Sequence, residues 1–214
     1  RIEARNGGFF PLQCAVSNGD RVVTVTLPDG EVEIFRAKAE PECGEGFTAQ
    51  TRVQMVFEPI DDTHATLEQS TYGLLAIATT AGSGVYNMVD PEQPNEPADP
   101  RLYRLTTPEG LVYELDQNFG IRRVIEPGGQ SLTYSTTGVV HTSGVGIQFV
   151  RDPQGRIRDL VLPDGGIVSY VYTASGDLDS VRDPVDQTTR YTYGLARFPH
   201  YLTEIADPRG VRAV

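Results

Sequence analysis

Three histidines are the residues best suited to acid-base chemistry, and His64 has the most suggestive neighbours. It follows a pair of aspartates at 61–62 and precedes Ser70, so the residue types of a hydrolase triad are present. Ser70 lacks the G-x-S-x-G turn that exposes such a nucleophile. His141 and His200 have no acidic residue at a repeated spacing. We therefore interpret the histidines as surface or turn residues and predict no catalytic residue and no enzyme activity.

Acidic residues offer a second kind of chemistry, metal binding, in the segment Asp90–Pro100 (DPEQPNEPADP). Calcium prefers carboxylate ligands, but this segment has no glycine at EF-hand spacing, and its prolines limit how ligands can converge. We favour an exposed, stiff loop, with calcium as the alternative. Ser70–Gly84 could form a strand pair or a short helix followed by a glycine-rich turn, and it lacks the lysine of a phosphate loop; we favour a mobile connector. No metal or cofactor is assigned.

Cys14 and Cys43 are the only cysteines. Neither belongs to a CxxC pair or stands beside a histidine, so a metal site is not indicated. In an oxidising compartment the two could form a disulfide. The sequence leaves the disulfide and two unlinked thiols open.

Composition and charge limit the class of protein. Hydrophobic residues make up 39% of the 214 residues and charged residues 22%, as in ordered globular proteins. The formal net charge is −11, which repels the phosphates of nucleic acids and anionic membranes. We therefore expect no nucleic-acid partner.

A repeated unit spans the chain. Two apolar residues three apart precede a proline, as in Ile157, Leu160 and Pro163, and the spacing occurs nine times, against about two expected by chance. The residue before the proline is often acidic, and glycine commonly follows the proline by two. Such an acid can cap turn amides, and the glycine supplies positive φ. Each unit is predicted to be a strand that ends in a hairpin turn.

A second strand follows each turn and often carries aromatic residues. Tyr170 with Tyr172, and Tyr191 with Tyr193, are two apart, so each pair shares one face of a strand. Apolar residues three apart do not share a face of a flat strand. Either both faces are covered, or a β-bulge intervenes, or the segment is a one-turn helix; we favour the bulge. The residues predicted to be structural in the repeats are Pro28, Gly30, Phe35, Gly120, Pro127, Tyr134, Gly155, Pro163, Gly165, Tyr170, Tyr172, Gly176, Asp183, Pro184, Tyr191, Tyr193, Asp207 and Pro208.

The order of these residues resembles a known family. Tyr170-Val-Tyr172, Gly176-Asp-Leu178, Val181-Arg-Asp183-Pro184 and Tyr191-Thr-Tyr193 resemble the tyrosine-aspartate (YD) or RHS repeat of bacterial proteins. The resemblance covers 102–214, and 22–35 resembles the module that precedes the repeats. The family's aspartate after the second tyrosine is replaced by Thr173 and Gly194.

The resemblance implies an all-β fold in which consecutive antiparallel β-hairpins form a curved, spiralling sheet. It also implies a pre-repeat module at 1–100, with the loop at 90–100, and repeats at 101–214. We expect a non-catalytic segment of the β-shell of a secreted or surface-displayed bacterial protein that encloses or displays a C-terminal toxin or effector. The alternative is a carbohydrate-binding or adhesion module that stacks tyrosines on cell-surface glycans.

The partners expected are further repeats and the C-terminal cargo of the same polypeptide. In a row of hairpins, the edge strand of each hairpin pairs with the first strand of the next hairpin. The last strand of the chain is therefore predicted to pair, through its free edge, with a strand of another copy.

Overall fold

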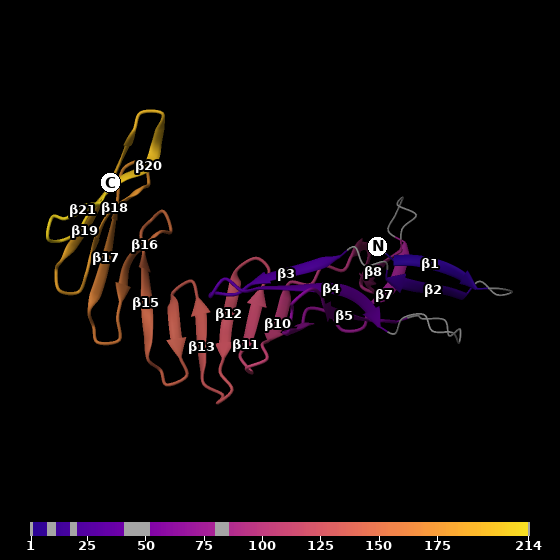
Figure 1. The fold of residues 1–214 in the computed structure, drawn as a ribbon. Helices are drawn as coiled ribbons and strands as arrows, with labels where there is room; N and C mark the ends of the chain where they lie inside the picture. Colours follow the sequence, from indigo (N-terminus) through magenta and orange to yellow (C-terminus); the bar gives the residue numbers. More distant parts are fainter. Residues whose placement is uncertain (1, 8–11, 18–20, 41–51, 80–85, 214) are drawn as a thin grey trace. The chain divides into compact units, whose positions relative to one another are not determined.

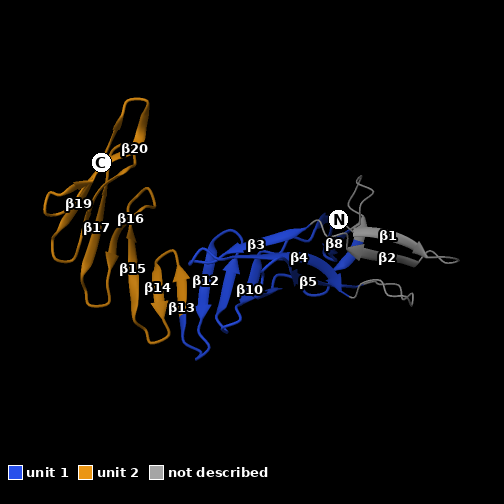
Figure 2. Cartoon of the chain, in the orientation of Figure 1, with its two compact units in different colours: residues 1–131 blue, residues 132–214 orange. Residues whose placement is uncertain are grey.

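The computed structural model describes residues 2–7, 12–17, 21–40, 52–79 and 86–213, and its strands all pair antiparallel. The described residues contain no helix, and so none that could span a membrane. The chain is thus all-β and built of hairpins, as predicted. It divides into two compact units, 1–131 and 132–214 (Figure 2).

The first unit contains a five-stranded sheet in which β2, β1, β8 and β7 lie side by side in that order and β9 also pairs with β8. Its strands are β1 (Ile2–Gly7), β2 (Leu12–Ser17), β7 (Ala76–Thr79), β8 (Tyr86–Asp90) and β9 (Gln93–Pro97). Met88 of β8 and Leu75, which precedes β7, are buried with Val53 and Met55 in one hydrophobic cluster.

Two further groups of strands in the first unit enclose its second hydrophobic cluster. One is the three-stranded sheet β3 (Val22–Thr26), β4 (Val32–Glu40) and β5 (Gln54–Pro59). The other pairs β6 (Thr66–Gln69), β10 (Leu102–Thr106), β11 (Val112–Asp116) and β12 (Gly120–Ile125) in that order. Leu27 and Phe35 from the first group pack with Leu67, Leu105 and Tyr113 from the second.

In the second unit, each strand pairs with the next one in the sequence (Figure 1). The strands are β13 (Ser131–Ser135), β14 (Gly138–His141), β15 (Gly146–Arg151), β16 (Ile157–Val161), β17 (Ile167–Tyr172), β18 (Leu178–Arg182), β19 (Thr188–Leu195), β20 (Phe198–Ala206) and β21 (Arg212–Ala213). The first and last of these strands do not pair with each other, so the sheet stays open.

One turn geometry recurs along the chain. In this five-residue turn, the N–H of the first residue donates to the carbonyl of the fifth, and the N–H of the fourth donates to the carbonyl of the first. In the turn that begins at Asp152, both N···O distances are 2.9 Å. The fourth residue has positive φ, for example 81° at Gly155, as in a type I turn followed by a G1 bulge. Among the described residues, nine turns share it, beginning at Leu27, Thr107, Glu126, His141, Asp152, Leu162, Thr173, Asp183 and Asp207.

The predicted β-bulge occurs in four of the eight apolar pairs whose residues are both described; Val85 of the ninth pair lies outside the described residues. In β16, Ile157 lies opposite Arg151 and Asp159 lies opposite Val150, so Arg158 is the extra residue. Because one residue is extra, Ile157 and Leu160 share a face despite their spacing of three. The same shift follows the first apolar residue in β12, β18 and β20, where the extra residues are Arg122, Asp179 and Thr203.

Three other predictions concern the loop at 90–100, the domain boundary, and the connector and cysteines. The loop predicted at Asp90–Pro100 is wrong for 93–97, which form strand β9, fully exposed and paired with β8. Proline is tolerated there because an edge strand need not donate on its outer side. The compact units divide at 131/132, whereas the repeat boundary at 100/101 stays a prediction. The connector predicted at 70–84 is wrong for 76–79, which form strand β7 paired with β8, and its residues 80–84 lie outside the described residues. Cys43 and the side chain of Cys14 also lie outside them.

Candidate functional site: the tyrosine face of the second unit

Strand register in the second unit gathers aromatic and aliphatic side chains on one face of the sheet. Tyr170 lies opposite Val181 and Tyr172 opposite Leu178, and successive pairs extend this face from β13 to β20. We call it the tyrosine face. Its aromatic and aliphatic members are Leu132, Tyr134, Val139, Ile147, Phe149, Ile157, Leu160, Val168, Tyr170, Tyr172, Leu178, Val181, Tyr191, Tyr193, Leu202 and Ile205, and Arg151 and Thr189 lie among them.

The bulges are what keep this face continuous. In β20, Ile205 lies opposite Tyr191 and Leu202 opposite Tyr193, because Thr203 is extra. In a flat strand, two residues three apart would point to opposite faces of the sheet. Each tyrosine pair in β17 and β19 therefore meets an apolar pair on the next strand.

No second layer covers the tyrosine face among the described residues. None of its members is fully buried; Leu202 exposes 40% and Ile205 36% of its surface, and the tyrosines are half-buried. In the first unit the equivalent pair, Leu105 opposite Tyr113, is covered by Leu27 and Phe35 of the three-stranded sheet. Leu105 is 0% and Tyr113 9% exposed there.

The opposite face of the second unit carries charged residues together with the exposed Val140, Ile167 and Val171. Asp159 lies opposite Ser169, which lies opposite Arg182 on the next strand. The Ser169 hydroxyl donates to Asp159 at 2.8 Å. The Arg158 guanidinium and this hydroxyl hold the pKa of Asp159 below its usual value. Charge is thus concentrated on the face that the tyrosines do not use.

Tyr172 is fixed by two contacts at the rim of the tyrosine face. Its hydroxyl donates to the carbonyl of Ile157 at 2.8 Å. The guanidinium carbon of Arg156 lies 4.2 Å from the ring centroid, within the range of a cation–π interaction. Arg156 is itself held by Asp152, 2.7 Å away.

Among the acids before proline in the repeated unit, the aspartates cap turns, as predicted, whereas Glu58 forms an ion pair with Lys38. A carboxylate oxygen of Asp207 accepts from the amides of Arg209 and Val211 at 2.9 and 2.8 Å, and Asp152 and Asp183 accept in the same way. The Arg209 side chain and the Val211 amide lower the pKa of Asp207. In turns with the sequence Pro-Asp-Gly, the aspartate after the proline caps the turn instead. Asp164, for example, accepts a hydrogen bond from the Gly166 amide at 2.9 Å.

The histidines do not assemble a nucleophilic site. His64 is exposed and has no hydrogen bond to Ser70 in the described part of the chain. His141 Nδ1 lies 2.8 Å from the Ser143 hydroxyl within its own turn. His200 Nδ1 lies 2.8 Å from Asp177, and this contact, with the Ser175 hydroxyl, lowers the pKa of the Asp177 carboxyl. The sequence spacing gave no sign of the His200–Asp177 pair.

The remaining repeat residues fall into turns and strands. Gly30, Gly120, Gly155, Gly165 and Gly176 have φ between 79° and 95°. Phe35 is completely buried in β4, whereas Tyr134 is half-buried in β13. The prolines lie in the turns that join consecutive strands: Pro28, Pro127, Pro163, Pro184 and Pro208. Sequence reasoning missed Phe149 and Val168, whose place on the tyrosine face appears only in the register.

Comparison with known proteins identifies no relative, since no protein-family model matches the sequence and no curated protein matches it.

Proposed function

We propose that the chain is a non-catalytic segment of the β-shell of a longer secreted or surface-displayed bacterial protein, and that its tyrosine face contacts polypeptide enclosed by the shell. The observation that carries this proposal is the continuous apolar face of the second unit, which no described residue covers. Contiguous exposed apolar surface of this kind marks a contact surface.

The chemistry of the two faces supports contact with polypeptide. The tyrosine face combines flat aromatic rings with aliphatic side chains, which can bury a wide range of protein surfaces. The opposite face carries Asp159 and Arg182, which suit contact with water. The resemblance to RHS repeats supplies the expectation that the enclosed polypeptide is a C-terminal toxin or effector.

Limited proteolysis with mass spectrometry on the longer protein tests this proposal. We expect the segment C-terminal to the repeats to survive under conditions that cleave exposed segments of equal flexibility. Prompt digestion of that segment would contradict enclosure.

A carbohydrate-binding or adhesive module is the second candidate, because the half-exposed rings of Tyr191 and Tyr193 could stack on sugars. Tyrosine nitration separates the two functions. Protection by added cell-surface glycans supports the second candidate, whereas protection by the remainder of the polypeptide supports the shell.

A further inference from the structure

The first unit contains a groove that follows the free edge of β3. The groove has a volume of about 440 Å³, within the range of ligand sites. Every residue from Arg21 to Thr26 lines it along one side. Tyr103, Leu115 and Ile121, from the sheet that β3 covers, also line it.

Backbone groups of β3 face this groove without partners. Across the β3–β4 pair, the Arg21 carbonyl accepts from Ala37 at 2.9 Å and the Leu27 N–H donates to Glu31 at 2.8 Å. Alternate residues of a strand direct their N–H and C=O groups to opposite edges. The backbone N–H and C=O groups of Val22, Thr24 and Thr26 therefore point away from β4. No other described residue pairs with these groups.

The other edge of the three-stranded sheet is less available. At the β5 side, Val53 already pairs with Leu75 through two backbone hydrogen bonds of 2.8 Å. No described strand pairs with the other edge of β3. A free edge beside an apolar floor is the arrangement that binds an added strand.

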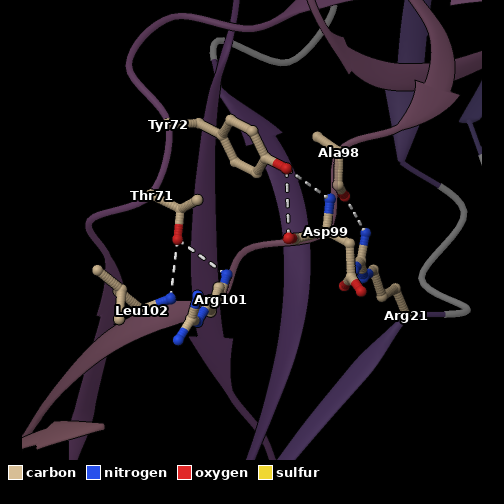
Figure 3. A network of polar contacts seen from close by, with 7 residues as sticks. All are labelled: Arg21, Thr71, Tyr72, Ala98, Asp99, Arg101 and Leu102. Carbon is tan, nitrogen blue, oxygen red and sulfur yellow. Dashed lines mark hydrogen bonds and ion pairs between the residues drawn. The ribbon is translucent and has the colours of Figure 1, made fainter. Parts of the chain in front are cut away.

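Two residues that line the groove, Arg21 and Asp99, belong to a network of polar contacts (Figure 3). Arg21 contacts the Ala98 carbonyl and the Asp99 carboxylate, and the Tyr72 hydroxyl contacts the backbone of Asp99 at 3.3 and 3.4 Å. Nearby, Asp116 is held by Arg101 at 3.0 Å. Each of these lining charges is therefore already paired, so the floor offers its occupant mainly apolar contact.

We infer that this groove binds an extended polypeptide segment that adds a strand to the free edge of β3. Its apolar side chains, at alternate positions, would lie on Tyr103, Leu115 and Ile121. Those contacts would extend the existing core, because Val23, Val25, Leu115 and Ile121 already pack against it. The net charge of −11 favours a segment that also carries basic residues. This inference concerns the first unit and does not depend on the shell function.

A synthetic peptide tests the inference on the unmodified 214-residue chain. The probe is fluorescently labelled Lys-Thr-Val-Thr-Val-Thr-Lys with blocked termini, measured by fluorescence anisotropy. We expect saturable binding below about 1 mM. Two further peptides carry N-methyl groups on either the threonines or the valines. One of them should lose at least about tenfold in affinity, because only one edge of the peptide donates to β3.

Variants of Thr24 provide the matched control. Thr24→Pro removes an outward N–H without touching the β3–β4 ladder and should weaken binding at least about tenfold, whereas Thr24→Val keeps the N–H and should bind normally. Circular dichroism checks that both variants fold. Absence of saturable binding, or equal affinity of the two N-methylated peptides, would overturn the inference. So would a dimer that Thr24→Pro converts to a monomer, since the occupant would then be a second copy.

Discussion

At the scale of single residues, the fourth position of the repeated turn is decisive because its φ is positive. Eight of the nine turns have glycine there, and the ninth has Asp186, with φ of 63°. A left-handed conformation costs a residue with a side chain roughly 1–2 kcal/mol. Glycine avoids this cost but loses roughly 0.5–1 kcal/mol in extra chain entropy.

Asp186→Gly should therefore stabilise the protein by about 0.5 kcal/mol. The ion pair that is lost, from Arg182 at 3.4 Å, joins two exposed side chains and contributes little. The measurement is the free energy of unfolding in urea. The matched reverse change, Gly155→Asp, should destabilise by a similar amount; stability changes of the same sign in both variants would refute the explanation.

The turn-capping acids predict a dependence of stability on pH. Asp207 has a lowered pKa in the folded chain, so its charge stabilises the fold above its unfolded pKa of about 3.9. That contribution is lost as the pH falls through the lower, folded pKa. Asp207→Asn keeps an accepting oxygen but not the charge. The stability difference between the native chain and this variant should be constant above about pH 5 and shrink toward about pH 2. A pH-independent difference would contradict the role of the charge.

At the scale of elements, the β-bulge explains the repeat's spacing of three. With Arg158 as the extra residue, deletion of Arg158 would restore regular pairing while Ile157 and Leu160 stay on one face. Deletion of Ser169 from β17 has a different effect, because it moves residues on one side of the deletion to the opposite face of the sheet.

Deletion of Arg158 should accordingly lower the melting temperature less than deletion of Ser169, which we expect to abolish cooperative unfolding of the second unit. Thermal melts followed by circular dichroism compare the two. Equal loss from both deletions would mean that the bulge does not set the register.

Local features of the fold could be predicted from sequence, because they are fixed by neighbouring residues. The strand ends, the glycine turns and the bulge after Ile157 all follow from spacing. Of the turns without proline, the one at 141–145 was not predicted, whereas the turn at 173–177 contains Gly176, one of the glycines predicted to be structural. Strand β9 was missed because it depends on pairing with β8. The cover of Leu105 by Phe35 is a distant contact that no local pattern contains.

At the scale of the whole molecule, the two units differ in whether described residues cover the apolar face of the sheet. In the first unit it is covered by the three-stranded sheet, and in the second no described residue covers it. The candidate site is thus the part of the repeat sheet that lacks a second layer. Its aromatic pairs could be predicted from the sequence, whereas its continuity depends on register across the eight strands β13 to β20.

Tyrosine nitration mapped by mass spectrometry tests the central claim most directly, by comparing the 214-residue chain with the longer protein that we propose contains it. We predict that Tyr170, Tyr172, Tyr191 and Tyr193, which are half-buried here, react in the isolated chain. In the longer protein they should be protected, while the more exposed Tyr201, at 60%, serves as the internal reference. Equal reactivity of the four tyrosines in both proteins would contradict the claim that this face contacts enclosed polypeptide.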